Sequence, residues 1–331
     1  MYHFIMNPTA SSGMGRRVWK EIKPILKERG EKYSLNVFRK QEALAAFVNG
    51  LTRRGGAQCD NTILSDRQKA VIKDALKEPD VHIVVLGGDG TLNLVLNSIV
   101  DMERTKLSCI RVGSGNDFAR NVGVEKDPAK ALLHLMKEPS ETVLDYGEAE
   151  YVMPDGKDTK RRFIISSGIG YDADICEEVS RSKLKRVLNV LHLGKLVYVI
   201  IGIKQIFTRG NTKVKLYMDD NAPIYAHNLF FAVGMIHEME GGGVPFCPNA
   251  DPCDGMLDVC VARSATKPKL MLEVAMVYLK KHLMFSNIDG YRCRKLRVVV
   301  EKPQWIHMDG ETPCRTSEAV LSCKTGLRFI K

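Results

Sequence analysis

The chain has 331 residues, of which 44% are hydrophobic and 27% charged, and its formal net charge is +10. This length and composition exclude a fibrous or disordered chain and leave room for two hydrophobic cores. The nine cysteines show no C-x-x-C spacing, which disfavours both a disulfide framework and a zinc knuckle. No basic segment followed by a long apolar run opens the chain, so we expect a cytoplasmic protein.

The positive charge suits nucleic acid, an anionic membrane or an anionic substrate as the partner. No nucleic-acid-binding motif accompanies the short basic clusters, such as Arg16-Arg17 and Lys280-Lys281, so we expect no nucleic-acid partner. The clusters fit solvated faces, nucleotide phosphates or the negative surface of a bilayer. The most apolar stretch, residues 187–203, contains His192, Gly194 and Lys195 and is too short to span a bilayer. This stretch can be interpreted either as a core helix or as a lipid-facing helix.

Strand and helix patterns alternate in the first 140 residues. Apolar strands are predicted at residues 2–6, 35–38, 81–86 and 108–112, and helices at 16–28, 43–51, 65–76 and 91–102. Residues 62–64 have the pattern of a further strand end, and Ser65 is predicted to cap the helix after it. Alternation of this kind predicts an open parallel sheet with right-handed crossovers.

The pattern changes after about residue 140. Short β-type runs are predicted at 162–166, 213–218, 228–233, 257–261 and 296–300, separated by turn clusters such as Met153-Pro154-Asp155-Gly156. Helices are predicted at 182–207 and 267–283. We therefore predict an α/β nucleotide-binding domain over residues 1–140 and a mostly antiparallel domain over residues 141–331, whose last residues could pack back on the first domain.

Two glycine-rich turns each follow a predicted strand and precede a predicted helix. They are Gly87-Gly88-Asp89-Gly90-Thr91-Leu92-Asn93 and Gly113-Ser114-Gly115-Asn116-Asp117. Glycines let backbone N–H groups approach phosphate oxygens, and the Asp and Thr of the first turn suit a magnesium–nucleotide site. A third loop, residues 7–15, follows the first strand. Because such loops gather at the carboxyl ends of parallel strands, we expect one nucleotide-phosphate site there. The loops contain neither a Walker A sequence nor Gly-x-Gly-x-x-Gly, which disfavours NAD as a redox cofactor.

The two turns, the second continuing to Arg120, resemble the diacylglycerol kinase catalytic-domain family, which comprises bacterial lipid kinases related to sphingosine kinases. The resemblance extends over nearly the whole chain and implies an α/β domain of the NAD kinase/diacylglycerol kinase-like type followed by a mostly antiparallel β-sandwich. It also implies ATP and Mg²⁺, a lipid substrate at the inner membrane face, peripheral membrane association and the option of a homodimer. The later landmarks that carry it are Gly168-Ile169-Gly170-Tyr171-Asp172-Ala173, Gly241-Gly242-Gly243, Asp254-Gly255-Met256-Leu257-Asp258-Val259 and Asp309-Gly310-Glu311.

The resemblance implies a role for each matching residue. Asp89 would organise the catalytic magnesium, and Asp309, with Glu311 beside it, would take the proton from the lipid hydroxyl as it attacks the γ-phosphorus. A structural magnesium would be held by the carboxylate of Asp254 and by backbone oxygens of Asp251 and Met256. ATP would be bound by Asn7, Pro8, Gly13, Gly87, Gly88, Asp89, Gly90, Thr91, Asn93, Ser114, Asn116 and Asp117.

Local sequence offers plainer roles for several of these residues. Asp117 could equally well cap the helix that follows it. The Asp-Gly pairs at 254–255 and 309–310 could be ordinary turns. Asp89 differs, because a carboxylate in a glycine turn after a buried strand favours a functional role.

The chain departs from the family pattern at two places. Leu94 stands where the family usually has glutamate, and the segment between Gly30 and Pro79 is longer than usual. A threonine position that contacts the nucleotide in that segment has two candidates here, Ser65 and Arg39. We therefore expect an ATP-dependent lipid kinase. The alternatives are a weakly catalytic nucleotide- or lipid-binding regulator, motivated by Leu94, and an NAD kinase-like enzyme with a soluble acceptor.

Overall fold

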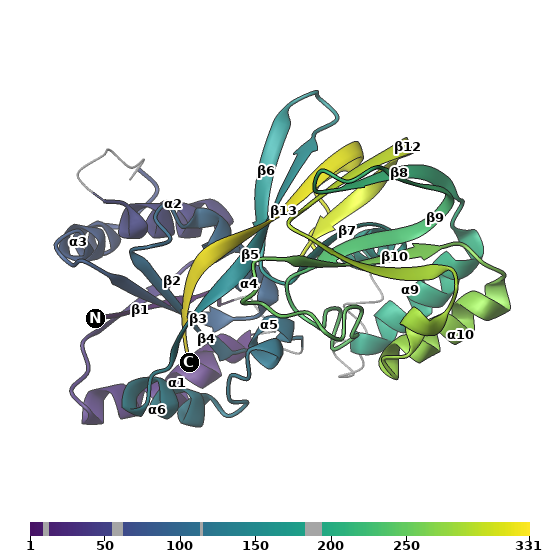
Figure 1. Cartoon of the computed structure of the whole chain (residues 1–331). Helices are drawn as coiled ribbons and strands as arrows, with labels where there is room; N and C mark the ends of the chain where they lie inside the picture. Colours follow the sequence, from purple (N-terminus) through teal and green to yellow (C-terminus); the bar gives the residue numbers. More distant parts are fainter. Residues whose placement is uncertain (9–12, 55–61, 113–114, 183–193) are drawn as a thin grey trace. The chain divides into compact units, whose positions relative to one another are not determined.

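The computed structural model describes residues 1–8, 13–54, 62–112, 115–182 and 194–331 (Figure 1). The chain forms two compact units, residues 1–144 together with 325–331, and residues 145–324. Both boundaries fall inside strands, β5 (Glu141–Val152) and β13 (Arg315–Ile330), which therefore contribute to both units. The C-terminal residues thus belong to the same unit as the N-terminal domain.

The first unit is built on a parallel sheet in the order β2-β1-β3-β4-β13. Its strands are β1 (Tyr2–Met6), β2 (Tyr33–Val37), β3 (Val81–Gly87), β4 (Thr105–Arg111) and the end of β13. Residues 83–86 of β3 are fully buried. A continuous apolar run of this kind is expected for a parallel strand that is covered on both faces.

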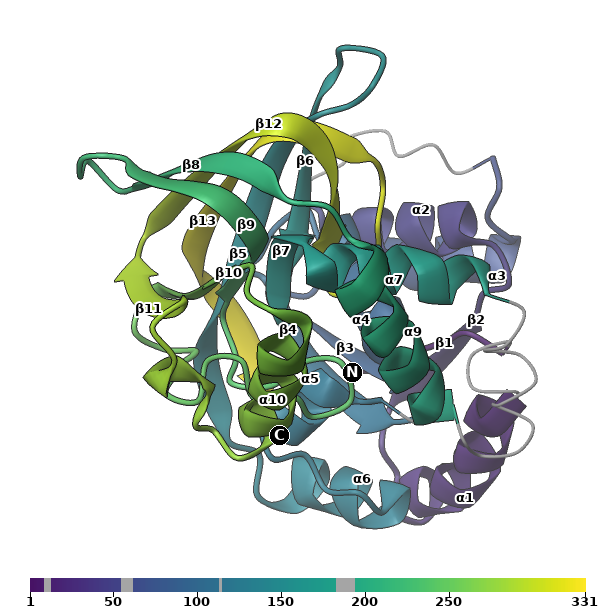
Figure 2. The same cartoon turned by 90° about the vertical axis from the view of Figure 1, so that its right-hand side faces the viewer.

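Helices cover both faces of this sheet. Helices α1 (Met14–Glu28) and α6 (Pro128–Lys137) contact each other on one face, and α2 (Gln41–Thr52) and α4 (Asp89–Ser98) contact each other on the other (Figures 1 and 2). Helix α3 (Asp66–Ala75) packs against α2, and the short helix α5 (Asp117–Asn121) lies at the end of β4. The observed sheet is the open parallel one that the alternating pattern predicts.

Two local expectations for this unit need correction. Residues 62–64, predicted as a strand end, form a turn, because Ser65 begins a capping box: its hydroxyl accepts from the Gln68 N–H, and the Gln68 side chain accepts from the Ser65 N–H. Helix α6 was not among the predicted elements, although Asp127 caps it and Pro128 occupies its first turn. Capping side chains mark both helix starts, and α6 also buries an apolar face formed by Ala131, Leu132 and Leu135.

The second unit consists mainly of antiparallel strands. They are β6 (Asp158–Phe163), β7 (Ser166–Gly170), β8 (Thr212–Met218), β9 (Ile224–Met235), β10 (Leu257–Arg263), β11 (Ile288–Cys293) and β12 (Lys295–Met308), with parts of β5 and β13. Strand β12 changes partner along its length: residues 296–300 pair with β8 and residues 306–308 with β7. This change lets one long strand border a large buried core that includes Phe163, Leu216, Leu296 and Ile306.

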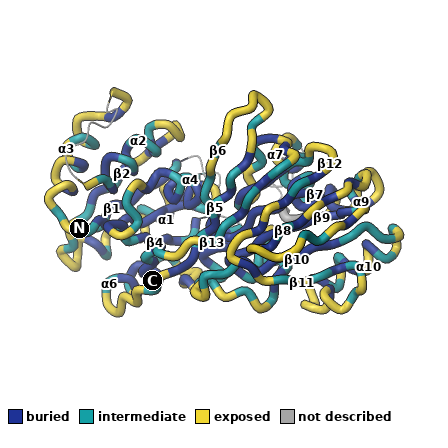
Figure 3. The backbone as a smooth tube through the Cα atoms, turned by 45° about the horizontal axis from the view of Figure 1, so that its top comes forward, coloured by how far each residue is buried: buried dark blue, intermediate teal, exposed yellow. Residues whose placement is uncertain are grey.

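Helices and a 3-10 turn accompany the strands in the described part of the second unit (Figure 2). Helix α7 (Tyr171–Arg181) follows β7 directly and packs against α9 (Gly194–Thr208), whereas α10 (Lys267–Tyr278) leads into η2 (His282–Met284). The predicted helix at 182–207 is therefore α9 in its described part, and residues 183–193 lie outside the described residues. No helix among the described residues is both long enough and apolar enough to cross a bilayer. Figure 3 shows that the strands are mostly buried, while the connection between β5 and β6 is exposed.

Candidate functional site

The strand order of the first unit places two candidate loops side by side. Strand β1 lies between β2 and β3; the chain leaves β1 through α1 toward β2, and leaves β3 through α4 toward β4 on the opposite side. The carboxyl ends of β1 and β3 therefore flank the switch point of the sheet, where open α/β sheets bind ligands. Asn7 and Pro8 follow β1, and Gly13, with φ of 86°, precedes α1.

The turn at residues 87–93 converts β3 into α4 without an intervening loop. Gly88 is the residue before the helix, and Asp89 is its first residue. A Cβ atom on Gly87 would lie 2.7 Å from Cβ of Thr91, so only glycine lets the first helical turn sit on the strand end. The first N–H groups of a helix have no partner within the helix and carry partial positive charge. This turn can therefore bind phosphate oxygens through its backbone.

The Asp89 carboxylate joins the two glycine turns. Its Oδ2 accepts from the Asp117 N–H at 3.0 Å, and its Oδ1 accepts from the Phe118 N–H at 3.2 Å, so it caps α5 from outside that helix. Asp117 itself pairs with Arg120 one turn later and does not cap the helix, whose first flanking residue is Asn116 with φ of 53°. Ser114, the remaining candidate of this turn, lies outside the described residues.

Other candidates of the first unit have clear local roles. Asn93 is fully buried, and its side-chain oxygen accepts from Nδ2 of Asn97 at 3.1 Å. Leu94, beside it on α4, is partly buried. Ser65 caps α3, as described above, which occupies its hydroxyl. The structure therefore assigns helix-forming contacts to Asn93 and Ser65 and leaves Arg39 exposed.

In the second unit, the Asp309 turn is held by its own carboxylate. Asp309 adopts φ of 50° directly after β12, and its carboxylate oxygens accept from the N–H groups of Ile164 at 2.8 Å, Ile165 at 2.8 Å and Ser166 at 3.1 Å. Glu311 bonds to Met308 through its backbone, at 2.9 and 3.0 Å, and its side chain is exposed. Asp309 therefore anchors the turn, and Glu311 presents its carboxylate to solvent.

The predicted metal loop carries several carboxylates within a few residues. Asp254 Oδ1 accepts from the Met256 N–H at 2.9 Å and Asp251 Oδ1 from the Cys253 N–H at 3.0 Å. Asp145, which the sequence analysis missed, is fully buried and accepts from the Gly255 N–H at 2.7 Å. Nothing in its local sequence marks Asp145; only the long-range pairing of β5 brings it here.

The electrostatics of this loop suit a hard cation. Burial raises the pKa of the Cys253 thiol, and the carboxylates of Asp251, Asp145 and Asp254 raise it further, which shows how much negative charge gathers there. All-oxygen donors in such a field fit Mg²⁺ or Ca²⁺. The guanidinium of Arg292 contacts Asp254 Oδ2 and serves as a counter-ion to the loop.

Two protein-family models match the chain. The model described as the diacylglycerol kinase catalytic domain matches residues 1–148, and the model described as the YegS C-terminal NAD kinase beta sandwich-like domain matches residues 165–325. Residues 1–148 belong to the diacylglycerol kinase catalytic-domain family. Membership in this lipid kinase family implies ATP as a substrate and, typically, a divalent metal. It confirms the resemblance carried by the glycine turns and the fold predicted for both domains.

Individual relatives agree with this family. YtlR of Bacillus subtilis (strain 168), named as a candidate lipid kinase, is 25% identical over 329 residues, which are 99% of this chain and 98% of the relative. A diacylglycerol kinase of the same strain is 27% identical over 251 residues, covering 76% of this chain and 77% of that protein. The solved structure of a candidate diacylglycerol kinase from Bacillus anthracis str. Sterne has a TM-score of 0.68 at 21% identity, covering 99% of this chain and 93% of its own. At this identity the structure shows a shared fold.

Proposed function

We propose that this diacylglycerol kinase family protein is an ATP-dependent lipid kinase that transfers the γ-phosphoryl group of Mg-ATP to the hydroxyl of diacylglycerol or a related lipid. The observation that carries the proposal is the glycine turn at the carboxyl end of β3, beside the switch point of the sheet. Backbone N–H groups at the start of α4 would bind phosphate oxygens, and Mg²⁺ bound with ATP would neutralise their charge. Asp89, already held by two N–H groups, supplies a fixed carboxylate at that turn.

Glu311 is the better candidate for the general base in this proposal. A general base needs a free lone pair within reach of the hydroxyl proton. Three backbone N–H groups take three of the about four acceptor positions of the Asp309 carboxylate. The Glu311 side chain is exposed on the same turn. Asp309 would thus position Glu311 through the turn rather than accept the proton itself.

A structural magnesium in the second unit is part of the proposal. The Asp254 carboxylate and backbone oxygens of Asp251 and Met256 would hold it, and Asp145 would fix the loop through Gly255. Its role would be to hold this acidic loop in shape, because a divalent cation offsets the repulsion among neighbouring carboxylates.

Phosphoryl transfer from labelled Mg-ATP to a panel of lipids in mixed micelles tests the proposal. We expect the wild type to label a single-hydroxyl lipid, and Glu311→Gln to lose about 10²- to 10⁴-fold in kcat without a change in melting temperature. Asp309→Asn should lose both activity and stability, because it disrupts three backbone contacts. Asp155→Asn, in the exposed turn between β5 and β6, is the matched control. Full activity of Glu311→Gln would contradict its role as the base.

The same assay separates the alternatives. A regulator with little catalysis, motivated by Leu94, would bind ATP, keep its fold and label no lipid. Leu94→Glu would then restore transfer if the missing glutamate is the cause. A kinase for a soluble acceptor would label NAD in the absence of detergent and leave lipids unlabelled. Either result would overturn the lipid kinase proposal.

We also propose that the second unit associates with an anionic membrane surface. Of nineteen large apolar side chains exposed among the described residues, ten lie on α9, α10 and the segment through η2. Helices α9 and α10 are in contact, so these side chains belong to one region of the unit. We call them the α9–α10 patch: Val199, Ile200, Ile203, Phe207, Met271, Leu272, Tyr278, Leu279, Leu283 and Met284.

Charge on the same segment supports a membrane rather than a neutral partner. Residues 267–285 contain four lysines and a single acidic residue, Glu273, which is 3% exposed. Basic residues beside exposed apolar side chains are the combination that binds anionic bilayers.

We expect the protein to sediment with phosphatidylglycerol-containing vesicles. The double variant Leu279→Gln, Met284→Gln should weaken this binding. Val100→Gln, at an exposed position of the first unit, is the control. Equal binding of both variants would contradict the role of the patch.

A further inference from the structure

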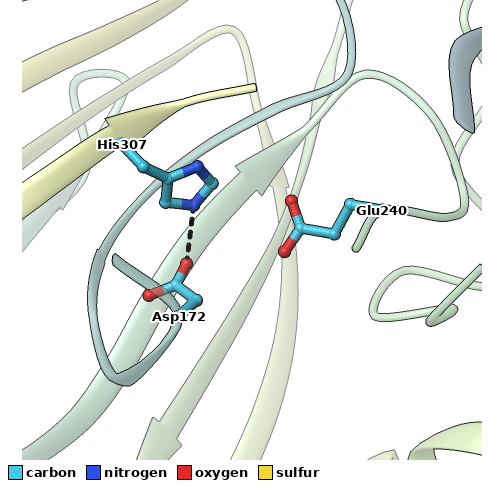
Figure 4. Close-up of side chains that lie close together, drawn as sticks. All are labelled: Asp172, Glu240 and His307. Carbon is cyan, nitrogen blue, oxygen red and sulfur yellow. Dashed lines mark hydrogen bonds and ion pairs between the residues drawn. The ribbon is translucent and has the colours of Figure 1, made fainter. Parts of the chain in front are cut away.

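Three side chains from distant parts of the sequence form a buried cluster in the second unit (Figure 4). Asp172 lies in the first turn of α7, Glu240 in the connection after β9, and His307 near the end of β12. They are 6%, 9% and 1% exposed. One oxygen or nitrogen atom of each lies within 4.8 Å of the corresponding atoms of the other two.

The contacts within the cluster are specific. His307 Nε2 lies 2.9 Å from Asp172 Oδ2, and Figure 4 shows the Glu240 carboxylate facing this pair. The Ser166 hydroxyl donates to Glu240, and the Gly310 N–H lies 3.4 Å from His307 Nδ1. A Cβ atom on Gly168 would overlap Asp172 Oδ2 and lie 3.0 Å from His307 Nε2. Glycine at position 168 thus leaves room for the Asp172 carboxylate and the His307 ring.

The Asp172 carboxylate is not fully satisfied by protein groups. Its Oδ1 is buried and has no hydrogen-bond partner among the described residues. An unpaired buried carboxylate oxygen is costly, so such groups commonly pair with a cation or a metal ion. Burial alone would lower the pKa of His307, but the carboxylates of Asp172, Glu240 and Asp309 raise it to about 9. The cluster therefore attracts positive charge.

We propose that Asp172, Glu240 and His307 form a binding site for a divalent transition-metal ion such as Mn²⁺, Fe²⁺ or Zn²⁺. Two carboxylates and one neutral imidazole balance a charge of +2. One nitrogen with carboxylate oxygens suits these metals, whereas Mg²⁺ favours ligation by oxygen alone. Asp172 Oδ1 is available as an additional donor. The Ser166 hydroxyl would orient Glu240 in the manner of an outer-shell group.

The site is distinct from the metals of the proposed kinase reaction and goes beyond that function. It uses none of the residues assigned to ATP or to the acidic loop at residues 251–256. Metal binding to Nε2 replaces the imidazole proton, which passes to the buffer, and leaves a proton on Nδ1. The Gly310 N–H lies 3.4 Å from Nδ1, the other ring nitrogen, so the site borders the turn that carries Glu311.

Equilibrium dialysis of the full chain with Mn²⁺ or Zn²⁺, followed by metal analysis, tests the proposal. Millimolar Mg²⁺ is included so that sites made of oxygen donors alone are saturated. We expect one equivalent of Mn²⁺ or Zn²⁺ in the wild type, and at least about 100-fold weaker binding in His307→Gln and Asp172→Asn. His282→Gln removes another buried histidine of the same unit, and Cys253→Ser removes an exposed thiol; both should retain the metal.

Two further measurements distinguish metal loss caused by misfolding from metal loss caused by removal of a ligand side chain. Circular dichroism establishes whether each variant is folded, and Glu240→Gln provides a nearly isosteric third variant. Bound Co²⁺ should show visible absorption bands without thiolate charge transfer in the wild type, and lose these bands in Glu240→Gln. Equal metal content in the wild type and His307→Gln would overturn the proposal. So would the absence of metal from both, in which case the proton on His307 is the cation of the cluster.

Discussion

Asp89 and Asp309 lie in different units and use their carboxylates in the same way. Each accepts from backbone N–H groups of another segment: Asp89 from the start of α5, and Asp309 from the connection between β6 and β7. Bonds between a carboxylate and backbone N–H groups are charge-assisted and therefore stronger than neutral ones. An aspartate after a strand can thus have a structural role and still stand at the centre of a turn for which a function is proposed.

Two buried histidines of the parallel sheet make its stability depend on pH. Burial lowers the pKa of both His3 and His82 to about 4, while Ser34 and Ser108 hold their neutral rings. A histidine in the unfolded chain titrates near 6.5, so the free energy of unfolding is unaffected above that pH. It falls progressively as pH drops from 6.5 to 4, by up to about 3 kcal/mol per histidine. Urea unfolding at pH 7.5, 5.5 and 4.5 should show this loss, and His82→Phe should reduce it. His227 is exposed, so His227→Gln should leave the pH dependence of the free energy of unfolding unchanged.

Arg292 should compete with metal at the acidic loop. Its guanidinium contacts Asp254, and both side chains are partly exposed, at 53% and 23%. Exposed ion pairs contribute about 0.2–1 kcal/mol, so Arg292→Met should tighten Mg²⁺ binding by at most about fivefold. Isothermal titration of Mg²⁺ into nucleotide-free protein measures the change. Arg297→Met, which removes the guanidinium paired with Glu318, is the control, and equal affinities for all three proteins would refute the competition.

At the level of elements, continuous apolar runs are easier to recognise in the sequence than the narrower apolar faces of amphipathic helices. Strand β3 and helix α10 were expected from their apolar residues, whereas α6 and α7 were not. Helix α7 begins directly after Gly170, where the sequence shows only a glycine-rich segment. Likewise Asp145, Glu240 and His307 could not be linked to their sites, because only strand pairing brings them near their partners. The glycine turns were recognisable because strand, turn and helix start are contiguous in sequence.

The junction between β7 and α7 should tolerate no side chain at Gly170. Its φ of 120° is strained for other residues, and a Cβ atom would lie 2.6 Å from the carbonyl oxygen of Phe230. Gly156, in the turn between β5 and β6, has φ of 82° with nothing within 4 Å of such an atom. Gly156→Ala should therefore cost about 1 kcal/mol of backbone strain, and Gly170→Ala about 1–3 kcal/mol more from overlap. Denaturant unfolding measures both, and equal losses would show that the overlap relaxes.

At the scale of the whole molecule, the proposed membrane binding would draw on two separable contributions, the net charge of +10 and the α9–α10 patch. Attraction to anionic lipid acts through solvent and is screened, with a Debye length of about 10 Å at 0.1 M salt and about 3 Å at 1 M. Insertion of apolar side chains is not weakened by salt. The two contributions should therefore respond differently to ionic strength.

We expect sedimentation with anionic vesicles to fall at least about tenfold between 0.05 and 0.5 M NaCl, since lysines near a charged surface contribute about 1 kcal/mol each at low salt. Residual binding at 0.5 M should depend on Leu279 and Met284, which are 63% and 72% exposed, so the Leu279→Gln, Met284→Gln double variant should remove it. Replacing Lys280 and Lys281 with glutamine should instead reduce the salt dependence of binding and leave the residual binding at 0.5 M NaCl unchanged. Binding that does not change with salt in the wild type would show that charge does not direct the protein to the bilayer, and the apolar side chains alone would then have to account for it.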